Sequence, residues 1–345
     1  MKNGLAISVL DLVGLRASES AGSAIARSVD LAQTVEKLGY KRYWLAEHHS
    51  ISGLVCSATS VLIGPIAGAT HTIRVGSGGI MLPNHAPLIV AEEFGTLDAI
   101  YPGRIDLGLG RAPGGDIQTM RALRRDLQQN EEDFPALIQE LQVYLGPERP
   151  GQMVKAIPGQ GSQAPITLLG SSLYSAQLAA ESGLPYAFAA HFAPQYLYAA
   201  AELYHTHFHP STVLRRPHLM VAVPVIAAET DAIAQRLFTT SQQRFVRLIR
   251  GQPVELLPPV DSMDAQWRNG EREAVQSKMR ESIIGSEATV KAGLERLTRE
   301  TGAAELIVVT DTYEHRDRVE SYQRVAGVAA TITMAMDSEG SRLSA

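Results

Sequence analysis

Short apolar runs alternate with longer segments of helical periodicity along most of the chain. The runs are rich in Val, Ile and Leu and are bounded by Gly, Pro or polar residues, which is typical of parallel strands buried on both faces. The pattern predicts eight strands, at 5–10, 42–46, 72–81, 104–110, 166–170, 185–189, 219–227 and 305–310. It predicts helices at 21–38, 57–70, 88–100 and 133–145, and further helices that begin near Ser172, Pro194, Thr230 and Ser286. This alternation favours an α/β fold, a (β/α)8 TIM barrel, over a doubly wound sheet.

The length of the chain fits one such barrel with two additions. A TIM barrel needs about 250 residues, and this chain has 345. We therefore predict a single domain over 1–345, with loop or insertion regions after strand four (about 112–165) and strand seven (about 250–285). Pro224 is the least favourable residue for this interpretation, because proline offers no N–H to a buried strand ladder.

Composition narrows the class of protein. Hydrophobic residues make up 45% of the chain and charged residues 19%, a balance that excludes general disorder. The formal charge of −5 argues against a nucleic-acid or anionic-membrane surface. The single cysteine, Cys56, excludes an internal disulfide and a cysteine-based zinc site, and we predict no metal. We find no signal-peptide core and no membrane-length apolar run, so we expect a cytoplasmic protein.

Polar residues at the carboxyl ends of barrel strands are the candidates for chemistry. Strand two is followed by Glu47, His48 and His49. One histidine can act as a general base or hydrogen-bond a substrate. The alternative is a solvated loop start or a buried neutral histidine, and the residues alone leave both open. The remaining histidines lack a recognisable zinc-ligand spacing.

Glycines end strand three in the run Gly76-Ser77-Gly78-Gly79. Glycine allows the backbone to approach a flat ligand closely, although a tight turn is the structural alternative.

Two neighbouring strand ends are suited to an anion. Arg111 follows strand four, with the glycines of 112–116 beside it, and Gly170, Ser171, Ser172 and Ser175 follow strand five at a helix start. Arginine and helix N-terminal amides both bind phosphate, whereas ordinary N-capping needs only one serine. The two elements together predict one phosphate held between them. The GLGRAPGG string does not match the dinucleotide-binding fingerprint.

Four segments, at 38–49, 72–116, 168–194 and 301–310, resemble the bacterial luciferase-like flavin-dependent monooxygenase family, especially its luciferase-like oxidoreductase branch. The resemblance implies a TIM barrel that binds reduced FMN at the carboxyl strand ends. It implies an enzyme that activates O2 as a flavin C4a-peroxide and oxygenates a small organic substrate. It also implies a separate NAD(P)H:flavin reductase as partner and a homodimer. Apolar residues of the 57–70 helix are a candidate dimer surface, although they are equally compatible with packing on the barrel.

The resemblance also implies roles for individual residues. His48 matches the active-site histidine beside the flavin. Gly78 and Gly79 match a position where such proteins often carry a non-prolyl cis peptide against the isoalloxazine ring. The residues that match the FMN phosphate site are Arg111, Ser172 and Ser175, and Gly170 and Ser171 are further candidates for cofactor binding.

Two alternatives stay open at this point. One is a barrel enzyme that uses a reduced deazaflavin as hydride donor, and the other is a non-catalytic flavin-binding protein. The segment after strand four differs from that of the light-emitting luciferases, so light emission is not expected. Neither insertion identifies a substrate.

Overall fold

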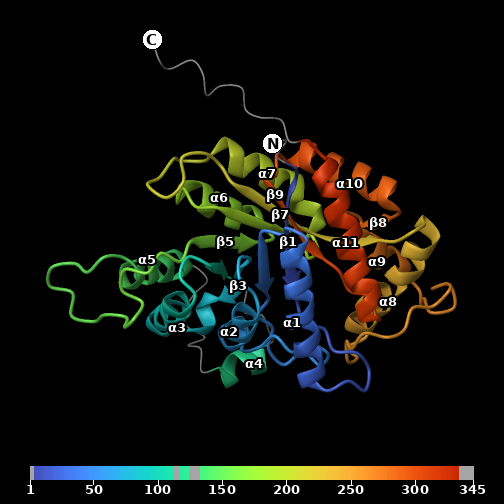
Figure 1. Cartoon of the computed structure of the whole chain (residues 1–345), viewed down its shortest axis with the longest axis horizontal. Helices are drawn as coiled ribbons and strands as arrows, with labels where there is room; N and C mark the ends of the chain where they lie inside the picture. The colour runs from blue at the N-terminus through green and yellow to red at the C-terminus, as the bar shows by residue number, and fades with distance from the viewer. Residues whose placement is uncertain (1–3, 112–116, 124–132, 334–345) are drawn as a thin grey trace, which may run out of the picture.

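A closed barrel of parallel strands forms the centre of the computed structural model, which describes residues 4–111, 117–123 and 133–333 (Figure 1). Within these residues eight strands close the ring in the order β1-β2-β3-β4-β5-β6-β7-β9, with β9 paired to β1. The eight strands are β1 (Ala6–Asp11), β2 (Arg42–Leu45), β3 (Arg74–Met81), β4 (Ile105–Gly110), β5 (Ile166–Gly170), β6 (Tyr186–Ala189), β7 (Leu219–Ala227) and β9 (Glu305–Val309). The predicted TIM barrel is confirmed.

Helices surround this barrel (Figure 1). Those that lie between its strands are α1 (Ala21–Lys37), α2 (Thr59–Ala69), α3 (Pro87–Ile100), α6 (Leu173–Glu181), α7 (Leu197–Thr206) and α10 (Glu287–Thr301), and α11 (His315–Thr331) follows the last strand. The insertion after β4 carries α4 (Ile117–Ala122) and α5 (Phe134–Leu145). The whole segment between β7 and α10, called the second insertion below, carries the predicted helix near Thr230 as α8 (Asp231–Ile249) and, within the predicted 250–285 region, α9 (Glu271–Lys278). Residues 112–116 and 124–132, which the sequence places in the first insertion, lie outside the described residues.

The second insertion also contains β8 (Ile283–Gly285), a short strand that the sequence did not predict. It pairs with Val225 to Ala227 of β7, whereas the preceding part of β7, up to Pro224, pairs with β9. Pro224 therefore stands where β7 exchanges one partner for another. A missing N–H is tolerated best at such a break in the ladder, which explains a proline in an otherwise buried strand.

A buried ion pair ties the first strand to the last helix. Asp11, at the end of β1, accepts hydrogen bonds from Arg318 of α11 (2.8 Å) and Ser28 of α1 (2.6 Å), and from Tyr43 of β2. Burial alone would raise the pKa of Asp11, but Arg318 and the hydrogen bonds lower it to about 2. The carboxylate thus holds four elements together as an ion.

Most apolar residues of the candidate dimer surface on α2 are buried against the rest of the same protomer. Leu62, Ile63 and Ala67 are buried in this protomer, whereas Val61 is 69% exposed. Homodimer formation stays a prediction. Among the residues that the structure describes, no helix is both long and apolar enough to cross a membrane.

Candidate active site

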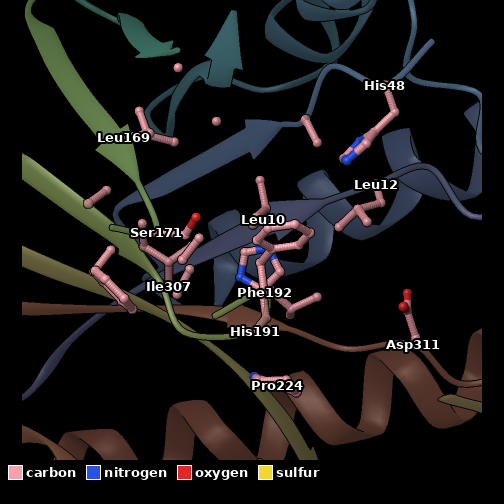
Figure 2. Close-up of a pocket in the computed structure, with 18 of the residues that line it drawn as sticks. Leu10, Leu12, His48, Leu169, Ser171, His191, Phe192, Pro224, Ile307 and Asp311 are labelled. Atoms are coloured by element: carbon pink, nitrogen blue, oxygen red, sulfur yellow. The ribbon is translucent and has the colours of Figure 1, made fainter. Parts of the chain in front are cut away.

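A cavity of about 700 Å³ opens at the carboxyl ends of the barrel strands. Its lining is mostly aliphatic and aromatic, with a few polar groups, as in typical ligand sites. All the site residues that the sequence predicted line this one cavity: His48, Gly78, Gly79, Arg111, Gly170, Ser171, Ser172 and Ser175. Figure 2 shows His48 and Ser171 on different sides of it, with His191 and Phe192 between them.

Arg111 and the start of α6 form the cationic side of the cavity. The guanidinium of Arg111 lies 4.4 Å from the centroid of the Tyr174 ring, a distance at which the ring face attracts and orients the cation. The first N–H groups of a helix have no partner within the helix and carry partial positive charge. Arg111 and these amides are therefore a donor set that fits a phosphate.

The serines of this side have different tasks. Ser172 and Ser175 form a reciprocal capping box at the start of α6, and the Ser175 hydroxyl also donates to the Ser172 carbonyl (2.8 Å). A Cβ built at Gly170 would lie 2.1 Å from the Ser175 Oγ, so glycine is required for this close approach. Ser175 thus fixes the helix start through its own hydrogen bonds, and Ser171 also lines the cavity.

The Gly78–Gly79 peptide is cis, as the resemblance implied. The pairing of β3 with β4 shifts register between Ser77 and Ile80, across this peptide. A Cβ at Gly78 would lie 2.7 Å from Leu10 Cδ1, and a Cβ at Gly79 would lie 2.7 Å from the Gly108 carbonyl oxygen. Packing inside the barrel therefore already requires glycine at both positions, whether or not a ligand also covers them.

His48 reaches the cavity from the segment after β2. Burial lowers its pKa to about 4, with smaller contributions from the nearby His191 and Arg244. Its Nδ1 lies 3.8 Å from the Cys56 sulfur. His48 is thus neutral near pH 7 and can offer one N–H donor and one nitrogen acceptor.

His191 is a second cavity histidine that the sequence reasoning missed. It follows β6 by two residues, so the strand-end rule that selected His48 also applies to it. Burial lowers its pKa to about 4. Its Nδ1 is buried and has no hydrogen-bond partner among the described residues.

Glu47 lies outside the cavity and organises the segment behind it. Its carboxylate pairs with His49 Nε2 (2.7 Å) and His85 Nε2 (2.9 Å) and accepts the Met81 N–H (2.9 Å). Although burial alone would raise the pKa of Glu47, these partners lower it. Glu47, His49 and His85 bring possible metal-ligand atoms within 4.8 Å of one another, but their direct hydrogen bonds account for the cluster without an ion.

The second insertion covers another side of the cavity, away from Arg111 and the start of α6. Arg244 of α8 forms a 2.7 Å ion pair with Asp311, which follows β9, and Ser241 donates to the Asp311 carbonyl (3.0 Å). Lys278, at the end of α9, also lines the cavity. Helical periodicity gives no signal for such residues, because they reach the cavity only when the insertion folds over the barrel mouth.

The sequence profile of luciferase-like monooxygenases matches residues 5–328. The chain belongs to the luciferase-like monooxygenase family. It is 49% identical to the luciferase-like monooxygenase of Escherichia coli strain K12 over 319 residues, which cover 92% of this chain and 95% of that protein. Membership in this family makes the protein an oxidoreductase of the monooxygenase type.

Solved structures show the same architecture as this luciferase-like monooxygenase. The crystal structure of apo-MsnO8 superposes with a TM-score of 0.87 at 35% identity, covering 94% of this chain and 98% of that one. The FMN complex of the oxygenating constituent of 3,6-diketocamphane monooxygenase from Pseudomonas putida has a TM-score of 0.73 at 18% identity, covering 97% of this chain and all of that one (100%). The second likeness shows the fold alone.

Proposed function

We propose that this protein is an FMN-dependent monooxygenase that uses reduced FMN and O2 to oxygenate a small organic substrate. The observation that carries the proposal is the cavity itself. A phosphate-binding side, a glycine-lined wall and a neutral histidine face one mostly apolar space. The FMN in the complex of the diketocamphane monooxygenase supports the choice of flavin.

Arg111 and the first amides of α6 would hold the FMN phosphate, with Tyr174 keeping the guanidinium in place. The Gly78–Gly79 segment would face the isoalloxazine ring. Reduced FMN, when bound, supplies the two electrons that activate O2 for insertion of one oxygen atom. A separate NAD(P)H:flavin reductase would deliver the reduced flavin.

His48 would act by hydrogen bonding. Because its pKa is lowered to about 4 by burial, it enters the reaction as a neutral imidazole near pH 7, able to accept or donate one proton at the substrate side of the cavity. The apolar lining would exclude bulk water, which strengthens each polar contact made inside.

Flavin binding tests the first half of the proposal. Reduced FMN is titrated anaerobically into the protein, with Arg111→Met beside the wild type and the exposed Arg299→Met as matched control. We expect micromolar binding, a loss of roughly tenfold to hundredfold in Arg111→Met, and no change in the control. Equal affinity of all three proteins for FMN would disprove the phosphate site.

Catalysis tests the second half. The protein loaded anaerobically with reduced FMN is mixed with O2 and flavin absorbance is followed, and the affinities for reduced FMN and for the reduced deazaflavin F420 are compared. Tighter binding of F420, without any oxygen-dependent transient, would favour hydride transfer instead. His48→Asn should keep FMN affinity but lose turnover once a substrate is found. Unchanged turnover would remove His48 from the mechanism.

A further inference from the structure

Lys278 is a cation without a counterion in the cavity. Among the described residues, no carboxylate lies within 4 Å of its ammonium group. The ammonium instead lies 4.0 Å from the centroid of the Phe192 ring and donates to the Phe192 carbonyl. Partial burial lowers the pKa of Lys278, yet nothing in this contact set balances its charge.

The other charged groups on this side of the cavity are already balanced. Arg244 is paired with Asp311 at 2.7 Å. His48 and His191 are neutral near pH 7, because burial lowers the pKa of each to about 4. The side of the cavity built by the second insertion therefore carries a net charge of about +1 in an apolar surrounding, an arrangement that favours an anionic ligand.

Two buried polar groups of the same cavity are also unpartnered within the described residues. They are the Nδ1 of His191, which directly precedes Phe192, and the Oγ of Ser282, which follows Lys278 by four residues. The charge of Lys278 reaches His191 and contributes to the lowering of its pKa. Buried polar atoms in proteins are nearly always hydrogen-bonded, so both atoms are available to hydrogen-bond a ligand group in the cavity.

We infer that Lys278, His191 and Ser282 form a subsite for a carboxylate on the substrate. A carboxylate accepts hydrogen bonds at both oxygens, which matches an ammonium, an imidazole N–H and a hydroxyl as donors. The inference rests on the proposed function, since it describes what is oxygenated beside the flavin. This carboxylate subsite is distinct from the proposed FMN phosphate site, which lies at the ends of β4 and β5.

The rest of the substrate is apolar. Apart from Ser241, Arg244, Lys278 and Ser282, the residues that the insertion adds to the cavity lining are hydrophobic: Phe238, Phe245, Leu248, Val254 and Met279. A short aliphatic chain that carries one carboxylate meets both the apolar lining and the cation. Neutral hydrocarbons would leave Lys278 unpaired, and amines would be repelled by it.

Binding of a matched set of probes tests the subsite. Sodium octanoate, methyl octanoate and octylamine are titrated calorimetrically into the full-length protein, with and without FMN. The variants are Lys278→Met, which removes the charge, Lys278→Arg, which keeps it, and Lys41→Met, which removes an exposed lysine before β2. FMN affinity is measured in parallel for each protein.

We expect octanoate to bind best of the three probes. Lys278→Met should weaken octanoate binding by roughly tenfold or more and leave methyl octanoate and FMN unaffected, while the other two variants behave as wild type. Equal octanoate affinity in wild type and Lys278→Met, or no preference for octanoate over its ester, would overturn the inference. A loss of FMN affinity alone in Lys278→Met would assign the cation to the cofactor and equally overturn it.

The two proposals fail separately. Selective octanoate binding that depends on Lys278, without measurable FMN binding, would reject the flavin enzyme and keep the carboxylate subsite. FMN binding that depends on Arg111, with no carboxylate preference, would do the reverse.

Discussion

Acid should destabilise this protein through its two cavity histidines. Burial lowers the pKa of His48 and of His191 from the ordinary value of 6.5 to about 4. Both therefore bind a proton more readily in the unfolded chain than in the folded one. Stability falls as the unfolded state takes up protons that the folded state refuses, so the loss begins near pH 6.5 and ends near pH 4.

The size of the effect follows from linkage. Near pH 5 an unfolded histidine is almost fully protonated, whereas one with a pKa of about 4 is mostly neutral. This difference corresponds to about 2 kcal/mol for each histidine relative to pH 7, or about 4 kcal/mol for both. Globular proteins are stable by only about 5 to 15 kcal/mol, so a shift of this size is easily measured.

Urea unfolding at about pH 7 and pH 5 measures this change in the free energy of unfolding. The proteins compared are the wild type, His48→Gln, His191→Gln and the double variant. Each single variant should reduce the pH-dependent loss of stability by about 2 kcal/mol and the double variant should reduce it by about 4 kcal/mol. The exposed His207→Gln is the matched control and should behave as wild type. If the double variant keeps the full acid sensitivity of the wild type, the assignment to these histidines is wrong.

Protonation of His85 has the opposite effect on stability: it stabilises the folded protein in acid. Although burial lowers its pKa, the hydrogen bond and charge of Glu47 raise it overall. Its contribution to stability is complete below the ordinary pKa and is lost as pH rises through the folded value. It therefore offsets part of the acid loss in every variant of the series, and the differences between variants are free of it.

Three further predictions concern single positions. Asp11→Asn should lower the free energy of unfolding by about 3 to 5 kcal/mol in urea titrations, because it leaves Arg318 buried without its counterion. Cys56, whose pKa burial raises to about 12, should resist a thiol reagent near pH 8 until the protein is unfolded. Gly170→Ala places a Cβ 2.1 Å from a serine hydroxyl of the α6 cap and should weaken FMN binding roughly tenfold by flavin fluorescence, whereas Gly22→Ala should not.

Local sequence patterns were sufficient to predict the barrel and to select the residues that we propose for the FMN side of the cavity. Buried parallel strands are continuous apolar runs, so the eight barrel strands were visible from the sequence. The polar residues directly after them, such as His48 and Arg111, could then be placed at one end of the barrel. His191 also follows a barrel strand closely, so the same rule could have selected it.

The insertion side could not be predicted in the same way. β8 has three residues, too few for a periodic signal. Arg244 and Lys278 lie on or at the end of amphipathic helices, where charged residues normally face water. Only the tertiary path of the chain, fastened by the Arg244–Asp311 ion pair, brings them to the cavity.

The change of pairing along β7, from β9 to β8, has a consequence for how the substrate range of this enzyme can change in evolution. Barrel closure is complete at Pro224, and the remaining residues of β7 pair with β8 instead of a barrel strand. The segment from α8 to β8 is thus attached to the barrel as a separate module. If the proposed FMN side and carboxylate subsite hold, we expect that exchanging residues 228–282 between relatives alters the range of compounds accepted and leaves flavin affinity unchanged, so that the two properties evolve independently.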